Sequence, residues 1–117
     1  MDERVVGRRH RYGYTVRFDA GSNKFEFNGG SLLRHDLAAG TTDVHDFGAG
    51  RGPSEFVMVP SSPDAGEDDG VLMGFVYDAQ RDASDLVVLD AQQLEPVAQV
   101  HLPVRVPYGF HGNWVSA

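Results

Sequence analysis

Cysteine is absent from this 117-residue chain, which excludes a disulfide framework, a zinc site with thiolate ligands and a cysteine nucleophile. Long apolar runs are absent too: none approaches the roughly 20 residues that span a bilayer. The start M-D-E-R lacks the apolar region of a secretory signal. Basic residues are few, with a formal net charge of -7 and a pI near 5.0. We therefore expect a soluble cytoplasmic protein that has no transmembrane segment and binds no nucleic acid.

Amphipathic helical patterns are also lacking, whereas short strand-like segments recur along the chain. Residues 10–18 alternate between aromatic or β-branched and polar side chains, a period typical of a strand. The nearly continuous apolar run 71–78 predicts a strand that is buried on both faces. The acidic stretch 61–70 lacks the ligand spacing of an EF-hand and predicts a solvated loop. The sequence therefore favours an all-β fold.

Two segments of similar design each predict a β-hairpin. In residues 31–47, Asp36 can bond backbone amides at the start of a turn, and Gly40 can supply a positive φ near its end. Residues 85–102 repeat the arrangement, with a turn that begins at Asp90. A repeat of about 50 residues made of short strands is typical of a β-propeller. Two blades cannot close a ring, so we expect an incomplete propeller that needs neighbouring blades.

The stretch 102–114, L-P-V-R-V-P-Y-G-F-H-G-N-W, contains the main candidate for a functional side chain. Gly109 and Gly112 flank Phe110 and His111, and glycine is used where the backbone takes unusual angles or another group comes close. His111 is either a metal ligand presented by this segment or a histidine in an ordinary turn. No two histidines have the spacing of a local metal clamp, so a metal site would need ligands from different strands.

Glu55 is the second candidate, because it begins the apolar strand 55–60 whereas most other acids lie in turns. A carboxylate there is either exposed at the strand end or hydrogen-bonded inside. Glutamate is rarely fully buried unless it is paired, which favours exposure. The preceding glycine-rich stretch 48–53 lacks the G-K-[ST] ending of a phosphate loop. No G-x-S-x-G is present, so a hydrolase nucleophile elbow is excluded.

Four stretches, in this order, resemble the C-terminal part of the carotenoid cleavage oxygenases. They are G-R-R-H-R-Y-G-Y (7–14), L-L-R-H-D-L-A-A-G-T-T (32–42), F-G-A-G-R-G-P-S-E-F-V-M-V-P (47–60) and the block 68–114 that ends in P-Y-G-F-H-G-N-W. The family includes the lignostilbene dioxygenases and the retinal pigment epithelium isomerase. Nearly all of residues 1–117 is covered, and the whole chain is identified as the C-terminal part of an oxygenase propeller domain.

The resemblance implies a seven-bladed β-propeller with one non-haem Fe(II), held by four histidines of which three are oriented by glutamates. His111 matches the last iron histidine and Glu55 matches one of the orienting glutamates. The family usually has glycine and proline where this chain has Ser54 and Phe56. The other four histidines match no ligand position. The implied reaction, a step of carotenoid catabolism, uses O₂ to cleave a C=C double bond of an apolar carotenoid, apocarotenoid or stilbene.

The family is several times longer than this chain, and the other three iron histidines have no counterpart in it. We therefore expect a fragment of such a dioxygenase, inactive alone, that needs the missing blades for activity. One imidazole binds Fe(II) weakly and without selectivity. The alternative is a small β module that binds a partner without catalysis. Such a module would fold with protected amides, although exposed blade edges promote aggregation.

Overall fold

The computed structural model describes residues 2–20, 27–107, 109 and 111–115, and these form short antiparallel strands and one 3-10 helix. The elements are η1 (Glu3–Val5), β1 (Tyr12–Ala20), β2 (Phe27–Asp36), β3 (Thr41–Asp46), β4 (Arg51–Pro60), β5 (Gly70–Asp78), β6 (Ala83–Asp90) and β7 (Pro96–His101). The all-β fold class expected from the sequence is thereby confirmed. None of the described residues lies in a helix that is long and apolar enough to cross a membrane.

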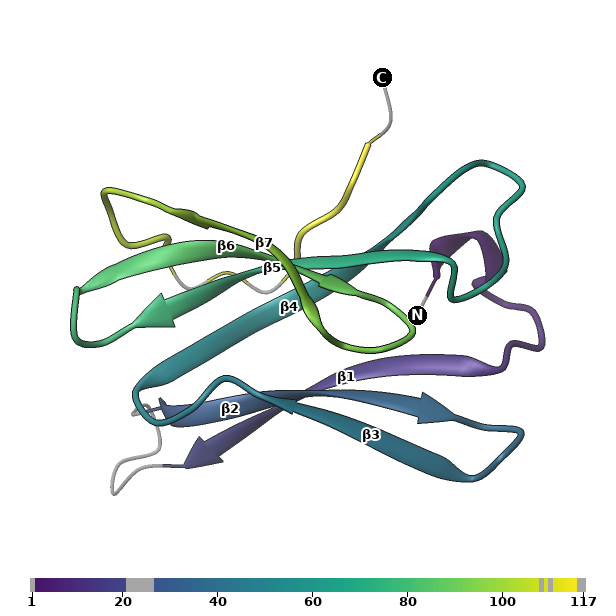
Figure 1. The fold of residues 1–117 in the computed structure, drawn as a ribbon, viewed down its shortest axis with the longest axis horizontal. Helices are drawn as coiled ribbons and strands as arrows, with labels where there is room; N and C mark the ends of the chain where they lie inside the picture. The colour runs from purple at the N-terminus through teal and green to yellow at the C-terminus, as the bar shows by residue number, and fades with distance from the viewer. Residues whose placement is uncertain (1, 21–26, 108, 110, 116–117) are drawn as a thin grey trace.

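The strands form two sheets, β1-β2-β3 and β4-β5-β6-β7, in which each strand pairs with its neighbour in sequence (Figure 1). Both hairpins expected from the sequence are present, as β2–β3 and β6–β7. The Asp36 carboxylate accepts two backbone N–H groups of its turn, and Gly40 has a φ of 69°. Asp90 accepts two backbone N–H groups in the second turn. Local turn chemistry therefore fixes both hairpins.

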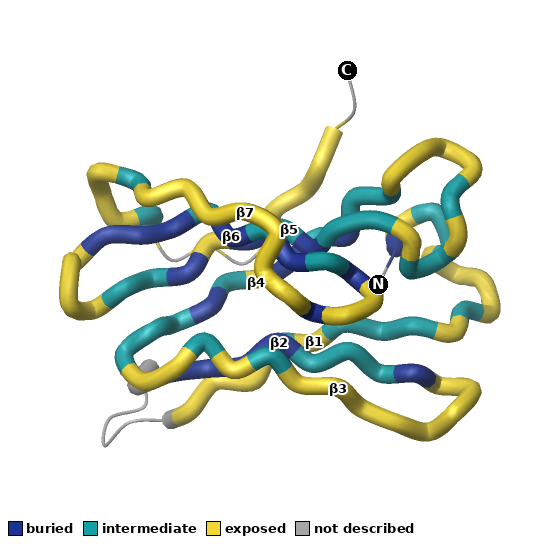
Figure 2. The backbone as a smooth tube through the Cα atoms, in the orientation of Figure 1, coloured by how far each residue is buried: buried dark blue, intermediate teal, exposed yellow. Residues whose placement is uncertain are grey.

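The core lies between the two sheets, where β4 packs against β1 and β2. In Figure 2 the buried residues lie mainly along β2, β4, β5 and β6, whereas β3 and β7 are exposed edge strands. Tyr14 bridges the layers, because its hydroxyl donates to the Ala91 carbonyl at 3.3 Å and burial raises its pKa to about 12. The buried apolar cluster consists of Leu32, Phe56, Met58, Leu72, Val76, Val87, Leu89, Ala91 and Leu94.

The prediction that residues 71–78 are buried on both faces is wrong. In β5, Leu72, Gly74 and Val76 are buried, whereas Phe75 on the opposite face is 38% exposed. The physical reason is that the sheet β1–β3 covers only one face of the sheet β4–β7 (Figure 1). An apolar run therefore marks the strand correctly but does not reveal how many layers cover it.

Residues 61–69 form a mostly exposed loop between β4 and β5, as predicted, but two of its acids also bind donors elsewhere in the fold. The Glu67 carboxylate accepts the backbone N–H groups of Arg11 and Tyr12, in each case at 2.7 Å. Asp68 forms an ion pair of 2.7 Å with Arg34, whose side chain is only 12% exposed. The acids bind donors that lie far away in the sequence, so the loop is attached to the sheet β1–β3.

Candidate functional site

The segment that follows β7 is attached to the sheet β4–β7 through Ser84. The Ser84 carbonyl accepts the backbone N–H of Leu102 at 3.0 Å, and the Ser84 N–H donates to the Val104 carbonyl at 3.1 Å. The Ser84 hydroxyl accepts the backbone N–H of Val106 at 3.0 Å. Ser84 is 1% exposed, so these bonds are shielded from water. The backbone after β7 is thus fixed before it reaches the candidate residues.

The structure brings Glu55 and His111 together. Glu55 lies on β4, and its Oε2 atom is 3.2 Å from the Nδ1 atom of His111. The same oxygen accepts the backbone N–H of Gly112 at 3.0 Å. One residue further on, the Asn113 side-chain amide donates to Glu3 Oε2 at 3.1 Å. Two candidates that are far apart in the sequence therefore form one site, and the C-terminal segment is attached on both sides of it.

The contact through Nδ1 determines what the His111 ring can do. An ionised carboxylate only accepts hydrogen bonds, so in the neutral ring Nδ1 carries the proton and Nε2 carries the lone pair. No hydrogen-bond partner of Nε2 is found among the described residues. The His111 side chain is 84% exposed and that of Glu55 is 44% exposed. An exposed pair of this kind contributes little to stability, but it leaves one ring nitrogen available as a metal ligand.

A complete metal site is not formed by the described part of the chain. Within it, no group of three or more histidine, aspartate or glutamate side chains could hold a metal ion. Fe(II) needs several fixed donors, for which neutral imidazole and carboxylate are suitable types. Glu55 and His111 therefore fit one ligand position of an iron site, with an imidazole and the carboxylate that orients it, and not the whole site.

The other histidines make local contacts at other places. His35 lies between the hydroxyls of Thr15 and Thr42, at 2.8 and 2.9 Å. The ring of His45 packs edge-on against Phe47, with 4.8 Å between the ring centroids. The remaining two, His10 and His101, contact a backbone carbonyl and a carboxylate respectively. None of these contacts involves Glu55 or His111.

A second histidine–carboxylate pair, which the sequence analysis missed, is centred on Asp85. This residue is 0% exposed, and its carboxylate lies 2.8 Å from His101 Nδ1 and 2.7 Å from Arg51 Nη2. Gln99 and Arg81 also donate to it. Burial alone would raise the pKa of Asp85, but the hydrogen bonds from His101, Arg51, Gln99 and Arg81 outweigh it and hold the pKa at about 2.

The cluster around Asp85 joins β4, β6 and β7. The signal in the sequence was an acid directly before the apolar run 86–89, the same signal that had singled out Glu55. Because every donor to Asp85 lies within the sheet β4–β7 or its turns, we assign this cluster a structural role.

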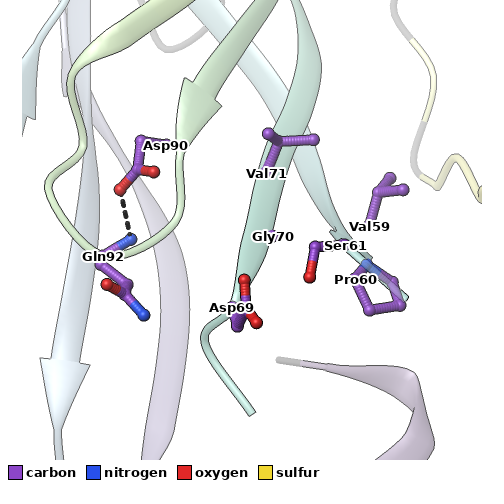
Figure 3. Close-up of a pocket in the computed structure, with 8 residues that line it drawn as sticks. All are labelled: Val59, Pro60, Ser61, Asp69, Gly70, Val71, Asp90 and Gln92. Carbon is purple, nitrogen blue, oxygen red and sulfur yellow. Dashed lines mark hydrogen bonds between the residues drawn. The ribbon is translucent and has the colours of Figure 1, made fainter. Parts of the chain in front are cut away.

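A shallow hollow of about 330 Å³ lies at one end of the sheet β4–β7 (Figure 3). Its polar groups include the carboxylates of Asp69 and Asp90, and the latter accepts the backbone N–H of Gln92 at 2.9 Å. Neither Glu55 nor His111 is among its lining residues. The hollow is therefore separate from the candidate site.

Residues 1–116 match the family described as retinal pigment epithelial membrane protein. The chain belongs to the carotenoid oxygenase family. The resemblance inferred from the sequence motifs is thereby confirmed.

The curated relatives include a carotenoid cleavage oxygenase of Mycobacterium tuberculosis, which is 41% identical over 119 residues. This match covers 97% of the chain but 23% of the relative. A carotenoid 9,10(9',10')-cleavage dioxygenase of Pisum sativum is 38% identical over 128 residues, covering 99% of the chain and 24% of the relative. The chain thus spans about a quarter of the length of the relatives that it matches.

Solved structures of the family have the same arrangement of strands. The lignostilbene dioxygenase of Pseudomonas brassicacearum matches with a TM-score of 0.88 and 29% identity, over 99% of this chain and 26% of that protein. The cobalt-substituted apocarotenoid oxygenase of Synechocystis matches with a TM-score of 0.80 and 32% identity, over 95% and 23%. The two sheets of this chain therefore correspond to blades of a β-propeller, and the propeller that they form is incomplete.

Proposed function

We propose that this chain is the part of a non-haem Fe(II) dioxygenase that supplies one iron ligand, His111, together with the carboxylate of Glu55 that orients it. The observation that carries the proposal is the contact of 3.2 Å between Glu55 Oε2 and His111 Nδ1, in a chain that belongs to the carotenoid oxygenase family. The contact leaves Nε2 as the metal-binding atom. The cobalt substitution named for the Synechocystis relative supports a metal site in this family.

The chemistry of the two residues suits this role. Neutral imidazole is a good ligand for Fe(II), and a carboxylate on the other ring nitrogen fixes the tautomer and raises the basicity of the ligating nitrogen. The hydrogen bond from Gly112 to the same carboxylate oxygen prevents Glu55 from turning away without loss of a backbone contact. In the complete enzyme, bound iron would provide the site at which O₂ reacts. His111 would be one ligand of that iron, and Glu55 would orient this ligand.

We propose an apolar, conjugated substrate that is cleaved at a C=C double bond, because the named relatives act on carotenoids, apocarotenoids or lignostilbenes. The chain alone would be inactive. It spans about a quarter of its relatives and offers one histidine at the candidate site, so the remaining ligands and the substrate chamber would come from further blades.

A chimera tests the proposal in a complete enzyme. The chain replaces the matching 119 residues of the Mycobacterium tuberculosis relative, and iron content and cleavage of an apocarotenal are measured. We expect His111→Ala to abolish both iron retention and cleavage. Glu55→Gln should lower iron affinity by about 10- to 100-fold, as is typical when the partner of a ligating histidine is removed.

His35→Ala is the matched control, because this histidine lies between two threonines on the other sheet. It should leave iron content and cleavage unchanged. Retention of one iron and of full cleavage activity by the His111→Ala chimera would refute the proposal.

A further inference from the structure

The strand that carries Glu55 is interrupted at this residue by a β-bulge. Pro53 pairs with Val76, and the next pair along the two strands is Phe56 with Gly74. Ser54 and Glu55 on β4 therefore lie opposite the single residue Phe75 on β5. An extra residue of this kind bends the strand and changes the direction of a side chain, and bulges are frequent next to functional sites. Here one of the two residues that form the bulge is Glu55, which contacts His111.

The Ser54 hydroxyl bridges the two strands inside this bulge. It accepts the backbone N–H of Phe75 at 3.1 Å and donates to the carbonyl of Glu55 at 3.2 Å. The first bond joins β4 to the facing strand at the residue opposite the bulge. The second holds the backbone of Glu55 itself. A side chain thus links the two strands where their regular pairing is interrupted.

Gly74 allows the strands to approach closely at the same place. A Cβ atom on Gly74 would lie 2.6 Å from Cδ2 of Phe56 and 2.8 Å from the carbonyl oxygen of Glu55. Both distances are shorter than van der Waals contact, so only glycine fits under the Phe56 ring. Ser54 therefore bridges the strands at the bulge, and Gly74 allows their close approach directly beside it.

We propose that Ser54 is a positioning residue, whose hydroxyl holds the bulge in the geometry that directs the Glu55 carboxylate at His111 and Gly112. The hydroxyl contacts the backbone of both strands, at the Phe75 N–H and at the Glu55 carbonyl. The effect of Ser54 on catalysis rests on the proposed iron site, whereas its effect on the position of Glu55 does not.

The test compares the 117-residue chain with its Ser54→Ala variant. Both are measured without metal and at a single pH at which imidazole is ordinarily neutral. NMR measures amide hydrogen exchange of Phe75 and Gly112 and the ¹⁵N shifts of the His111 ring, which report its tautomer. We expect exchange of both amides to be about five- to tenfold faster, the effect of losing one hydrogen bond. The His111 ring should move from the tautomer with the proton on Nδ1 towards the one with the proton on Nε2.

Three controls separate positioning from a general loss of structure. Ser54→Thr keeps the hydroxyl and should keep the original tautomer and protection. Ser61→Ala removes an exposed hydroxyl just beyond the end of β4 and should change neither signal. The amides of Leu72 and Val87 report the surrounding sheet and should stay protected in every variant.

Two results would overturn the proposal. In the first, Ser54→Ala leaves Phe75 exchange unchanged, which would show that the bridge makes no contribution. In the second, Phe75 exchanges faster while the His111 tautomer and Gly112 protection stay the same, which would reduce Ser54 to a purely structural residue. Because no metal is used, a failure of the iron proposal would not produce either result.

Discussion

The described part of the chain contains two histidine–carboxylate pairs, His101–Asp85 and His111–Glu55, in which the imidazole faces the carboxylate through Nδ1. The distances are similar, 2.8 and 3.2 Å, but the surroundings differ. Asp85 is 0% exposed and accepts from two arginines and a glutamine as well. The side chain of Glu55 is 44% exposed, and among the described residues its one further donor is the Gly112 backbone N–H. We therefore expect the same two chemical groups, an imidazole and a carboxylate, to serve different purposes in the two pairs.

We infer from this difference that burial and the number of donors decide the role of such a pair. At Asp85, several donors compensate the burial of a charge and connect three strands, which favours stability. At Glu55, the partners orient an exposed ring and contribute little to stability. A site that is completed by ligands from elsewhere needs the second kind of pair.

Removal of the buried charge of Asp85 should have the largest effect on the free energy of unfolding. We expect Asp85→Asn to lower the free energy of unfolding by about 3 kcal/mol, because it leaves the buried ends of its donors without a charged partner. Glu55→Gln should change it by less than about 0.5 kcal/mol, since that pair is exposed. Urea unfolding followed by circular dichroism measures both. An equal loss of unfolding free energy in the two variants would contradict the distinction between the buried and the exposed pair.

The dependence of stability on pH should show the same contrast. The pKa of Asp85 is held at about 2, below the ordinary value of 3.8. Its contribution, about 2 kcal/mol, is therefore complete above pH 4 and is lost as the pH falls towards 2. Other acids also titrate there, so the difference between the original chain and Asp85→Asn isolates this residue. Urea unfolding at several pH values should give curves that converge towards pH 2, and parallel curves would contradict the assignment.

The smallest expected effects concern the two histidines. We expect His101→Gln to cost about 1 kcal/mol, because it removes one donor to the buried Asp85 but its own side chain is 66% exposed. His111→Gln should leave stability unchanged within the error of thermal unfolding. A larger loss for His111→Gln than for His101→Gln would show that the C-terminal segment is structural and not a site.

The sequence predicted those parts of the fold that depend on local chemistry. Asp36 and Gly40 made the first hairpin recognisable, because a turn is specified by adjacent residues. The exposed face of β5 and the attachment of Glu67 could not be predicted, because both depend on partners far away in the sequence. An apolar run and an acidic loop have the same pattern whether or not another element covers them.

The same limit applies to the candidate site. His111 and Glu55 were found separately, from flanking glycines and from an acid in an apolar strand, and only the family resemblance related them. Their hydrogen bond needs the bulge at Ser54, which arises from the pairing of β4 with β5 and not from either strand alone. Strand register is a property of two segments together, so a pattern along one of them does not specify it.

The most direct test of the account is to locate weakly bound Co(II) on this chain by NMR. Paramagnetic broadening in a titration with Co(II) should be centred on the His111 ring and the Gly112 amide, without saturation at one equivalent, because one imidazole is a weak site. It should be weaker in Glu55→Gln, absent in His111→Ala and unchanged in His35→Ala. Broadening that is centred on another histidine, or that persists in His111→Ala, would contradict the claim that His111 is the metal ligand of this chain.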